Sequence, residues 1–453
     1  METDLRILQA LIQFYHDPEE TMILHNSFSV NTDGHLTIGG LDAVALAEQF
    51  GTPAYFLDTD AVRAVCREYK AAFTAYYGEQ SAPVFAGKAL CCKRIYEIAA
   101  EEGLMADCVS PGELYTANAA GFPMEKVFFH GNNKTDADLA MALDLGVGHI
   151  VVDSPDELAA LDAIAENKGL KPAILLRITP GIDPHTHQKI VTGNVDSKFG
   201  MAILTGQAFD FVKTALTCKN LTLDGFHCHV GSQIFEIDPF VEAADIMLAF
   251  IAKIREKFGY TAKILNIGGG FGVRYTEDDP TISYTDNIRR IGEEIDRMCS
   301  VYGIDKPAIL MEPGRSIVAA AGVTLYTCGS VKTVNGFRSY VSVDGGMPDN
   351  PRYTLYQSRY TFVNASHADL DADFSCTISG RCCESGDLLG EGVSIAKPQR
   401  GDIIATLVTG AYNYSMASNY NRLPRPPMIE IAGGEAKVII RRETYADLIR
   451  LDV

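Results

Sequence analysis

The chain has 453 residues, of which 47% are hydrophobic and 21% are charged, and its formal net charge is −19 at pH 7. This negative charge repels phosphate backbones and anionic headgroups, and no apolar run approaches the roughly 20 residues that cross a bilayer, so neither nucleic acid nor a membrane is expected as a partner. A chain of this length exceeds what one hydrophobic core usually organises, which predicts two domains.

The N-terminal segment and the cysteines both indicate a cytoplasmic protein. The first residues, METDLRILQALIQFYHDPEE, are acidic and amphipathic and lack the basic start and apolar run of a secretory leader. The 11 cysteines are scattered, and two pairs of them are adjacent, which does not suit a disulfide framework. We therefore expect reduced thiols.

Residues 28–38 alternate between apolar and polar side chains around the turn residues 31–34, which predicts a strand pair. Eight short apolar runs follow between residues 80 and 312, separated by amphipathic stretches long enough for helices. The runs are 83–88, 104–108, 126–130, 149–153, 173–178, 223–230, 263–269 and 308–313. This order predicts an α/β fold with a (β/α)8 TIM-type barrel. An open doubly wound sheet is the alternative, although GGGFG lacks the dinucleotide spacing.

Polar and glycine residues cluster where these predicted strands end. In a barrel the ends share the active-site face, and the loops after strands seven and eight, here GGGFG and EPGR, often bind a phosphate there. The cluster comprises Lys88, Asp107, His130, Asp153, Arg177, His229, Gly268 to Gly270, and Glu312.

After residue 313 the sequence changes to short β-rich runs with turn residues, such as VTLYTCGSVKTV, RGDIIATLV and EAKVIIRRE. We expect a β-sandwich or barrel-like C-terminal domain. The predicted domains are 41–312 for the barrel and 313–453 for the β domain, with residues 26–40 joining the β domain.

Several of these residues suit chemistry on an aromatic aldehyde cofactor. Lys88 follows a predicted buried strand, where lost solvation lowers the pKa of an amine enough for a Schiff base, although a lone lysine is more often a solvated strand cap. In HCHVGSQ, His227 and His229 share one side of a strand. They suit a cofactor face, a zinc site, or a buried structural pair.

The glycine run of residues 268–272 exposes backbone N–H groups to an anion, particularly if a helix begins there. Glu312 could hold a pyridine nitrogen in its protonated, electron-withdrawing form. Cys383 and Glu384 lie in RCCESGD, and a cysteine beside an acid is unremarkable by itself.

Taken in order, the motifs resemble those of the fold-type III pyridoxal-phosphate-dependent decarboxylases, and within them the diaminopimelate decarboxylase family. The similarity covers nearly the whole chain. It comprises DGHLTIGGLDAVALAEQFGTPAYFLD, FAGKAL, DCVSPGEL, TGNVDSKFGM, HCHVGSQI, IGGGFG, MEPGRSIVAAAG, DGGMPDNPRYTLY, CCESGD and GAYNYSMASNYN.

The resemblance implies that pyridoxal 5′-phosphate is bound through Lys88, with His229 on the ring face and Glu312 at the ring nitrogen. It also implies catalytic roles for Lys88, His229 and Cys383, the last as proton donor, and places Asp107 beside the cofactor. The phosphate would be held by Ser232, Gly268, Gly269, Gly270, Gly314, Arg315 and Tyr412. The substrate would be bound by Arg315, Arg352, Tyr356, Glu384 and Tyr412.

The implied reaction is decarboxylation of meso-2,6-diaminopimelate to L-lysine, the last step of lysine biosynthesis, by a homodimer whose active sites are shared across the interface. Two arginines suit a substrate with two carboxylates. The alternatives are a decarboxylase of ornithine, arginine or carboxynorspermidine, a racemase on the same barrel, a non-catalytic homologue, and a zinc hydrolase suggested by His185 with His187 and His227 with His229. We expect no metal.

Overall fold

The structure, a computed structural model, describes residues 25–182 and 196–453. Its residues cluster into two compact units. The described residues within 65–272 and 282–314 form the barrel unit, and those within 17–64, 273–281 and 315–453 form the β unit. His185 and His187 lie outside the described residues.

Eight parallel strands of the barrel unit close into a ring, as the sequence predicted. The ring order is β5-β6-β7-β8-β9-β11-β12-β13, and β13 pairs with β5 again. A further short strand, β10 (Met201–Ala202), adds to β9. The bounds are β5 Ala82–Ala86, β6 Met105–Cys108, β7 Val127–Phe129, β8 His149–Val152, β9 Ala173–Thr179, β11 Thr222–His227, β12 Ile264–Asn266 and β13 Ala308–Met311.

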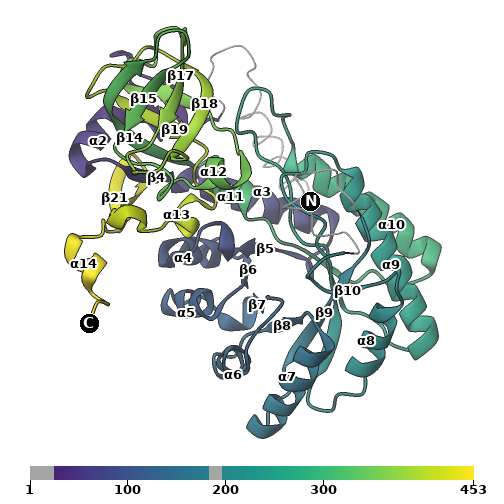
Figure 1. The fold of residues 1–453 in the computed structure, drawn as a ribbon. Helices are drawn as coiled ribbons and strands as arrows, with labels where there is room; N and C mark the ends of the chain where they lie inside the picture. The colour runs from purple at the N-terminus through teal and green to yellow at the C-terminus, as the bar shows by residue number, and fades with distance from the viewer. Residues whose placement is uncertain (1–24, 183–195) are drawn as a thin grey trace. The chain divides into compact units, whose positions relative to one another are not determined.

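Helices follow the strands and surround them on the outside (Figure 1). Their starts carry side-chain caps typical of helix N-termini: Ser110, Ser154 and Ser283 each accept a hydrogen bond from a backbone N–H of the first turn. The helices are α3 Thr59–Tyr76, α4 Lys93–Glu101, α5 Pro111–Ala119, α6 Asp136–Asp144, α7 Pro155–Lys168, α8 Gln207–Ala215, α9 Asp238–Phe258 and α10 Tyr284–Tyr302. Short 3₁₀ turns occur at η1 (Gly87–Ala89) and η2 (Met124–Lys126).

The barrel interior begins with an apolar layer. Val84, Phe128, Val151, Leu175 and Leu310 form one buried cluster, against which Met105 and Ile264 also pack. Each comes from a different strand of the ring. Because side chains alternate between the two faces of a strand, the residue two positions further along each strand faces the interior again, one layer nearer the active-site end. The apolar layer therefore supports whatever side chains the sequence places in the next layer.

The β unit contains a mixed sheet in the order β18-β17-β15-β14-β4-β20-β21, with β19 pairing both β14 and β16. Its central strand, β14 (Gly322–Thr333), pairs with β4 and β19 along its first half and with β15 along its second. The other strands are β4 Ala54–Asp58, β15 Ser339–Val343, β16 Phe362–Asn364, β17 Phe374–Ser379, β18 Leu388–Ile395, β19 Ile403–Leu407, β20 Met428–Ala432 and β21 Glu435–Ile440. The expectation of a β-rich C-terminal part is confirmed.

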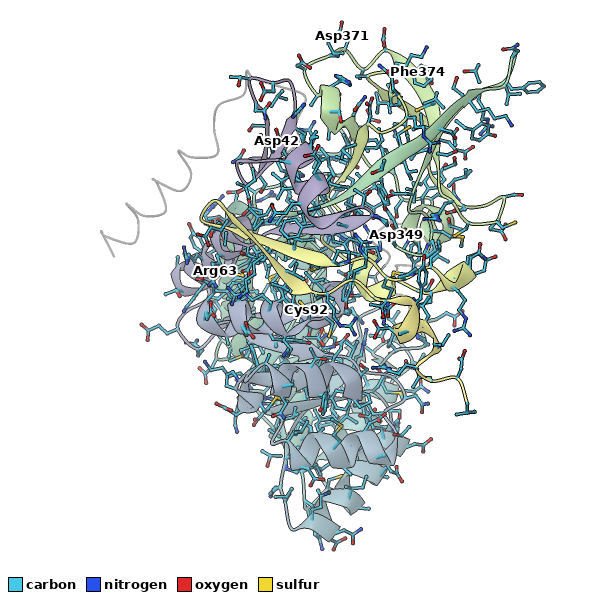
Figure 2. All side chains as sticks on the ribbon, turned by 90° about the vertical axis from the view of Figure 1, so that its left-hand side faces the viewer. Asp42, Arg63, Cys92, Asp349, Asp371 and Phe374 are labelled. Atoms are coloured by element: carbon cyan, nitrogen blue, oxygen red, sulfur yellow. The ribbon has the colours of Figure 1, made fainter. Side chains whose placement is uncertain are left out.

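Short helices and turns complete the β unit. They are α2 Ala43–Phe50, α11 Arg315–Val318, α12 Arg352–Tyr356, η4 Ala365–His367, α13 Asn413–Met416, η5 Tyr420–Arg422 and α14 Tyr445–Ile449. Asp42 caps α2 by accepting hydrogen bonds from the backbone N–H groups of Val44 and Ala45 at 2.8 and 3.2 Å, and its position is labelled in Figure 2.

The N-terminal strands differ in detail from the sequence expectation. The predicted pair is present as β1 (Phe28–Val30) and β2 (Leu36–Ile38), which form a separate sheet with β3 (Leu41–Asp42). β4, a strand absent from the sequence prediction, lies between β14 and β20 in the mixed sheet of the β unit. Its partners are far away in sequence, so no local pattern reveals the pairing. The division at residues 41 and 312 stays a prediction.

The described residues contain no helix that is both long and apolar enough to cross a membrane. All 11 cysteines have free thiols, in agreement with the sequence expectation.

The close approach of β11 to β12 gives a first testable prediction. A Cβ atom at Gly225 would lie 1.9 Å from the carbonyl oxygen of Ile264, so Gly225→Ala forces two barrel strands apart. We expect a loss of about 1 to 3 kcal/mol in the free energy of unfolding, the usual cost of overpacking. Urea unfolding followed by circular dichroism measures it. Gly112→Ala is the control, because a Cβ atom there meets nothing nearer than 3.7 Å. Equal stability of the two variants would contradict the prediction.

Candidate active site

A layer of buried polar side chains lies directly beyond the apolar layer of the barrel. Each member follows an inward-facing residue of its own strand by two positions, so strand alternation points it into the interior. Seven residues of the layer are polar and Ala86 occupies the remaining position on β5; the polar residues, all buried, are Asp107, His130, Asp153, Arg177, His227, Asn266 and Glu312. Polar groups of both signs at this depth require partners or a ligand.

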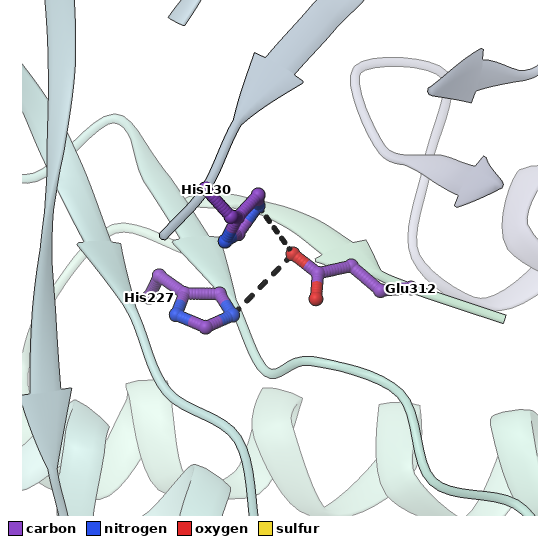
Figure 3. A group of neighbouring side chains, drawn as sticks. All are labelled: His130, His227 and Glu312. Atoms are coloured by element: carbon purple, nitrogen blue, oxygen red, sulfur yellow. Dashed lines mark ion pairs between the residues drawn. The ribbon is translucent and has the colours of Figure 1, made fainter. Parts of the chain in front are cut away.

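The contacts of Glu312 dominate this layer. Its Oε1 atom lies 3.0 Å from Nε2 of His130 and 3.3 Å from Nε2 of His227 (Figure 3), and it accepts a hydrogen bond of 2.7 Å from Nδ2 of Asn266. Only 6% of Glu312 is exposed. Burial by itself would raise the pKa of this carboxyl group, but the two imidazoles outweigh burial and hold the pKa well below its usual range. Glu312 is therefore a buried carboxylate that stays ionised.

Lys88, Asp107 and His229 share one electrostatic environment. Lys88 is half-buried in η1, immediately after β5. Burial lowers the pKa of His229 well below its usual value, and the positive charges of Lys88 and Arg177 lower it further. Burial also raises the pKa of Asp107, whereas the interactions of its carboxyl group with His130 and Lys88 lower that pKa. The amine, the imidazole and the carboxylates predicted from separate motifs thus lie close enough to influence one another's ionisation.

The glycine loop after β12 brings bare backbone close to other groups. A Cβ atom at Gly269 would lie 2.0 Å from the carbonyl oxygen of Glu312, and one at Gly270 would lie 2.5 Å from that of Gly231. Gly268 has φ +73° beside the ring of His229. A Cβ atom at Gly314 would likewise lie 2.9 Å from the Cβ atom of Ala86. No helix starts at this loop, since α10 begins at residue 284. Ser232, half-buried, directly follows Gly231.

The β unit gathers two buried arginines around one aromatic ring. The guanidinium carbons of Arg315 and Arg352 lie 4.8 and 5.1 Å from the ring centre of Tyr412. Arg352 also lies 5.2 Å from the ring centre of Tyr356, and Arg315 donates a hydrogen bond of 2.6 Å to the hydroxyl of Tyr275. Two guanidinium groups held on a shared ring form a site for anionic groups.

Cys383 and Glu384 lie exposed on a loop between β17 and β18. The backbone N–H of Cys383 donates a hydrogen bond of 2.7 Å to Oδ1 of Asn421. Buried Asp387 anchors the loop, since its Oδ2 accepts from the N–H of Cys382 at 2.7 Å and its Oδ1 accepts from the N–H of Met347 at 2.6 Å. Both side chains are thus exposed at a restrained position.

The structure also brings forward residues to which the sequence reasoning gave no role. From the sequence, His130 is only a strand end, His227 only shares a strand side with His229, and Asn266 belongs to none of the quoted motifs. The sequence does contain a signal for Asn266, because it is the one strongly polar residue in the apolar run ILNI. Within the described residues, His130, His227 and Glu312 are also the one group of acidic, histidine or cysteine side chains spaced to hold a metal ion.

Comparison with known proteins identifies the family. The profile described as "Pyridoxal-dependent decarboxylase, pyridoxal binding domain" matches residues 59–319. The diaminopimelate decarboxylase of Bacillus subtilis strain 168 is 46% identical over 95% of this chain and 98% of that protein. A crystal structure of diaminopimelate decarboxylase from M. jannaschii in complex with L-lysine has a TM-score of 0.88 and 33% identity, and covers 95% of this chain and 99% of that one.

A lysine/ornithine decarboxylase of Vibrio vulnificus, solved with putrescine, is less similar, with a TM-score of 0.71 and 25% identity over 85% of this chain and 96% of that one. The closed parallel barrel and its buried carboxylate, together with these matches, define a pyridoxal-phosphate-dependent decarboxylase. Within that class, the chain belongs to the diaminopimelate decarboxylase family.

The residues of the barrel interior fit pyridoxal 5′-phosphate. Oδ1 of Asp107 is buried and has no hydrogen-bond partner among the described residues, as expected where a polar ligand completes the layer. Glycines at 268–270 and 314 let these loops pack closely beside the polar layer, because a Cβ atom at any of them would collide with neighbouring protein atoms. The ionised carboxylate of Glu312 suits a protonated ring nitrogen.

Asp387 is expected to be essential for the loop that carries Cys383. Asp387→Asn replaces one acceptor oxygen by an amide that cannot accept from a backbone N–H, which leaves a buried donor unsatisfied at a cost of about 1 to 3 kcal/mol. We expect a lower unfolding temperature in calorimetry, with faster reaction of Cys383 with a maleimide as the loop loosens. Exposed Asp371→Asn, also in the β unit (Figure 2), is the control. A variant with wild-type stability and alkylation rate would refute the anchoring role.

Proposed function

We propose that this chain converts meso-2,6-diaminopimelate to L-lysine and carbon dioxide. Support comes from its 46% identity to a diaminopimelate decarboxylase over nearly the whole chain, and from the L-lysine in the complex of a relative with TM-score 0.88. The chemical support is the pair of buried arginines on Tyr412, since a dicarboxylic substrate needs two cationic sites. Comparing turnover of diaminopimelate, ornithine, arginine and carboxynorspermidine tests the choice, and faster turnover of any rival would overturn it.

In the barrel unit, the proposed catalytic residues are Lys88 and His229. Lys88 would supply the amine that binds the cofactor aldehyde. His229, whose pKa burial lowers, would lie against the cofactor face without adding charge to it. The phosphate is assigned to donors from Ser232 and the loops of 268–270 and 314, together with Arg315 and Tyr412, and Asp107 lies beside the cofactor.

The bound cofactor supplies an electron sink for the electron pair left on Cα when the carboxylate departs as carbon dioxide. Glu312 maintains that sink by holding the proton on the ring nitrogen. Cys383 returns a proton to Cα, and Arg315, Arg352, Tyr356 and Tyr412 bind the substrate. Glu384 is assigned to its distal ammonium group. For the residues of the β unit, these roles rest on the resemblance.

We further propose a homodimer in which Cys383 and Glu384 complete the active site of the partner subunit. Both side chains are exposed on a restrained loop, the arrangement expected of groups that act across an interface. A cytoplasmic location is also proposed, because 11 free cysteines suit a reducing compartment.

Lys88→Ala is expected to abolish turnover, because no other amine takes its place, and to remove the site at which borohydride fixes the cofactor to the protein. Carbon dioxide release and mass spectrometry of the reduced protein measure the two effects. Lys93→Ala, an exposed lysine five residues later, is the control and should behave as wild type. Normal turnover by Lys88→Ala would end the proposed mechanism.

Mixing two inactive variants tests the shared active site. Cys383→Ala is expected to lose most activity while it keeps its cofactor, and Lys88→Ala to lose all. If the two side chains belong to one site on different subunits, random reassortment places one intact site in half of the dimers and restores about a quarter of wild-type activity. Cys382→Ala mixed with wild type serves as the control for subunit exchange. No recovery, in a mixture that exchanges subunits, would place both groups on one chain.

A further inference from the structure

The orientation of Asn266 in the polar layer is determined by its neighbours. Its Oδ1 accepts a hydrogen bond of 2.9 Å from the backbone N–H of Gly268, so its amide nitrogen is the atom that faces Glu312 at 2.7 Å. An amide cannot present its nitrogen as an acceptor, and Asn266 is therefore a donor to Oε1 of Glu312.

The two imidazoles are oriented by the same argument. Nε2 of His130 lies 3.0 Å from Oε1 of Glu312 and 3.9 Å from Oδ1 of Asp107, two acidic oxygens. Nε2 of His227 lies 3.3 Å from Oε1 of Glu312. Neither Nε2 atom meets the geometry of a hydrogen bond, so each imidazole lies against Oε1 as a close polar contact, which the tautomer with a hydrogen on Nε2 favours. The rings meet edge to face with centres 4.8 Å apart, so each restrains the other.

Three groups from three strands of the ring therefore converge on a single oxygen. In Figure 3 both dashed lines from the imidazoles end on the same oxygen of Glu312, and none meets the second carboxylate oxygen. Every contact given above for Glu312 is made by Oε1. When one oxygen of a carboxylate is held in place, the direction in which its second oxygen points is also determined.

We propose that His130, His227 and Asn266 are positioning residues that hold Oε1 of Glu312, so that its Oε2 is presented to the ring nitrogen of the cofactor. This inference rests on the proposed role of Glu312. The other charged or titratable groups around Glu312 are Asp107, Arg177, Cys228 and His229. They influence its charge, whereas the three positioning residues determine its geometry.

The test uses the holoenzyme loaded with cofactor labelled with ¹⁵N in its ring, whose chemical shift reports protonation of the ring nitrogen. His130→Leu and His227→Leu each remove one imidazole contact with Oε1 of Glu312. We expect each variant to lose protonation of the ring nitrogen at a lower pH than wild type. We also expect kcat to fall about 10- to 100-fold, the effect of one hydrogen bond to a charged group, while KM stays within about threefold.

Conservative variants separate donor loss from packing. His130→Gln and His227→Gln keep an N–H group at the place of Nε2 and should restore most of the protonation. If a leucine variant does not fold, His227→Asn replaces it, because the shorter amide stays polar but does not reach Oε1. His149→Leu is the matched control: this ring lies at the start of β8, the opposite end of the strand from the polar layer, where it contacts Phe128 and Asp224, and its loss should leave the ¹⁵N shift unchanged.

Glu312→Gln distinguishes this inference from the proposed function. If Glu312→Gln leaves the ring nitrogen protonated as in wild type, the role assigned to Glu312 is wrong. If Glu312→Gln removes the proton but the histidine variants keep wild-type shifts and kcat, the positioning role is wrong and the proposed function stands. Adding His227→Leu to Glu312→Gln should change the shift no further, because both act through one carboxylate.

Discussion

The barrel buries a carboxylate that must remain charged, and the arrangement of its interior follows from that requirement. Moving an isolated carboxylate from water into a protein interior costs several kcal/mol or more. In the barrel this cost is offset by convergence: Asn266, His130 and His227 all meet Oε1 of Glu312. Because these residues occupy different strands, the ring must close before the carboxylate is stabilised. Closure of the barrel and ionisation of Glu312 are thus coupled.

Strand alternation connects this charge to the stability of the barrel. The apolar layer that contains Leu310 and Phe128 gives way, two residues on, to the polar layer that contains Glu312 and His130. A shift of one residue in strand register would exchange inward and outward faces and place these polar groups among the outer helices. The same register therefore maintains both the hydrophobic core and the chemistry.

The β unit uses a different principle, since its functional groups lie on short helices and loops. Arg315 and Arg352 are held on the ring of Tyr412, and the loop of Cys383 is held by the buried carboxylate of Asp387. Loops held in this way combine a defined position with exposed side chains. Such exposure suits groups proposed to act on a partner subunit.

Much of this could be predicted from the sequence. The eight barrel strands, the strand pair around residues 31–34 and the β-rich C-terminal part are confirmed, because each depends on a local pattern of apolar and polar residues. The same local pattern predicts three site residues, because a recognisable strand ends at each of them: Lys88, His229 and Glu312. The pairing of β4 with β14 and β20 was missed, because its partners are remote in sequence.

The sequence by itself determined the class of fold and the chemical groups available to it, since strand alternation and the residues at strand ends are properties of short segments. Only the tertiary structure decided which groups meet. From the sequence, His227 only shares one side of a strand with His229, whereas in the structure it contacts Glu312 together with His130 and Asn266. The physical reason is closure of the barrel: the angular order of strands around the ring, and not their spacing in the chain, determines which inward side chains touch.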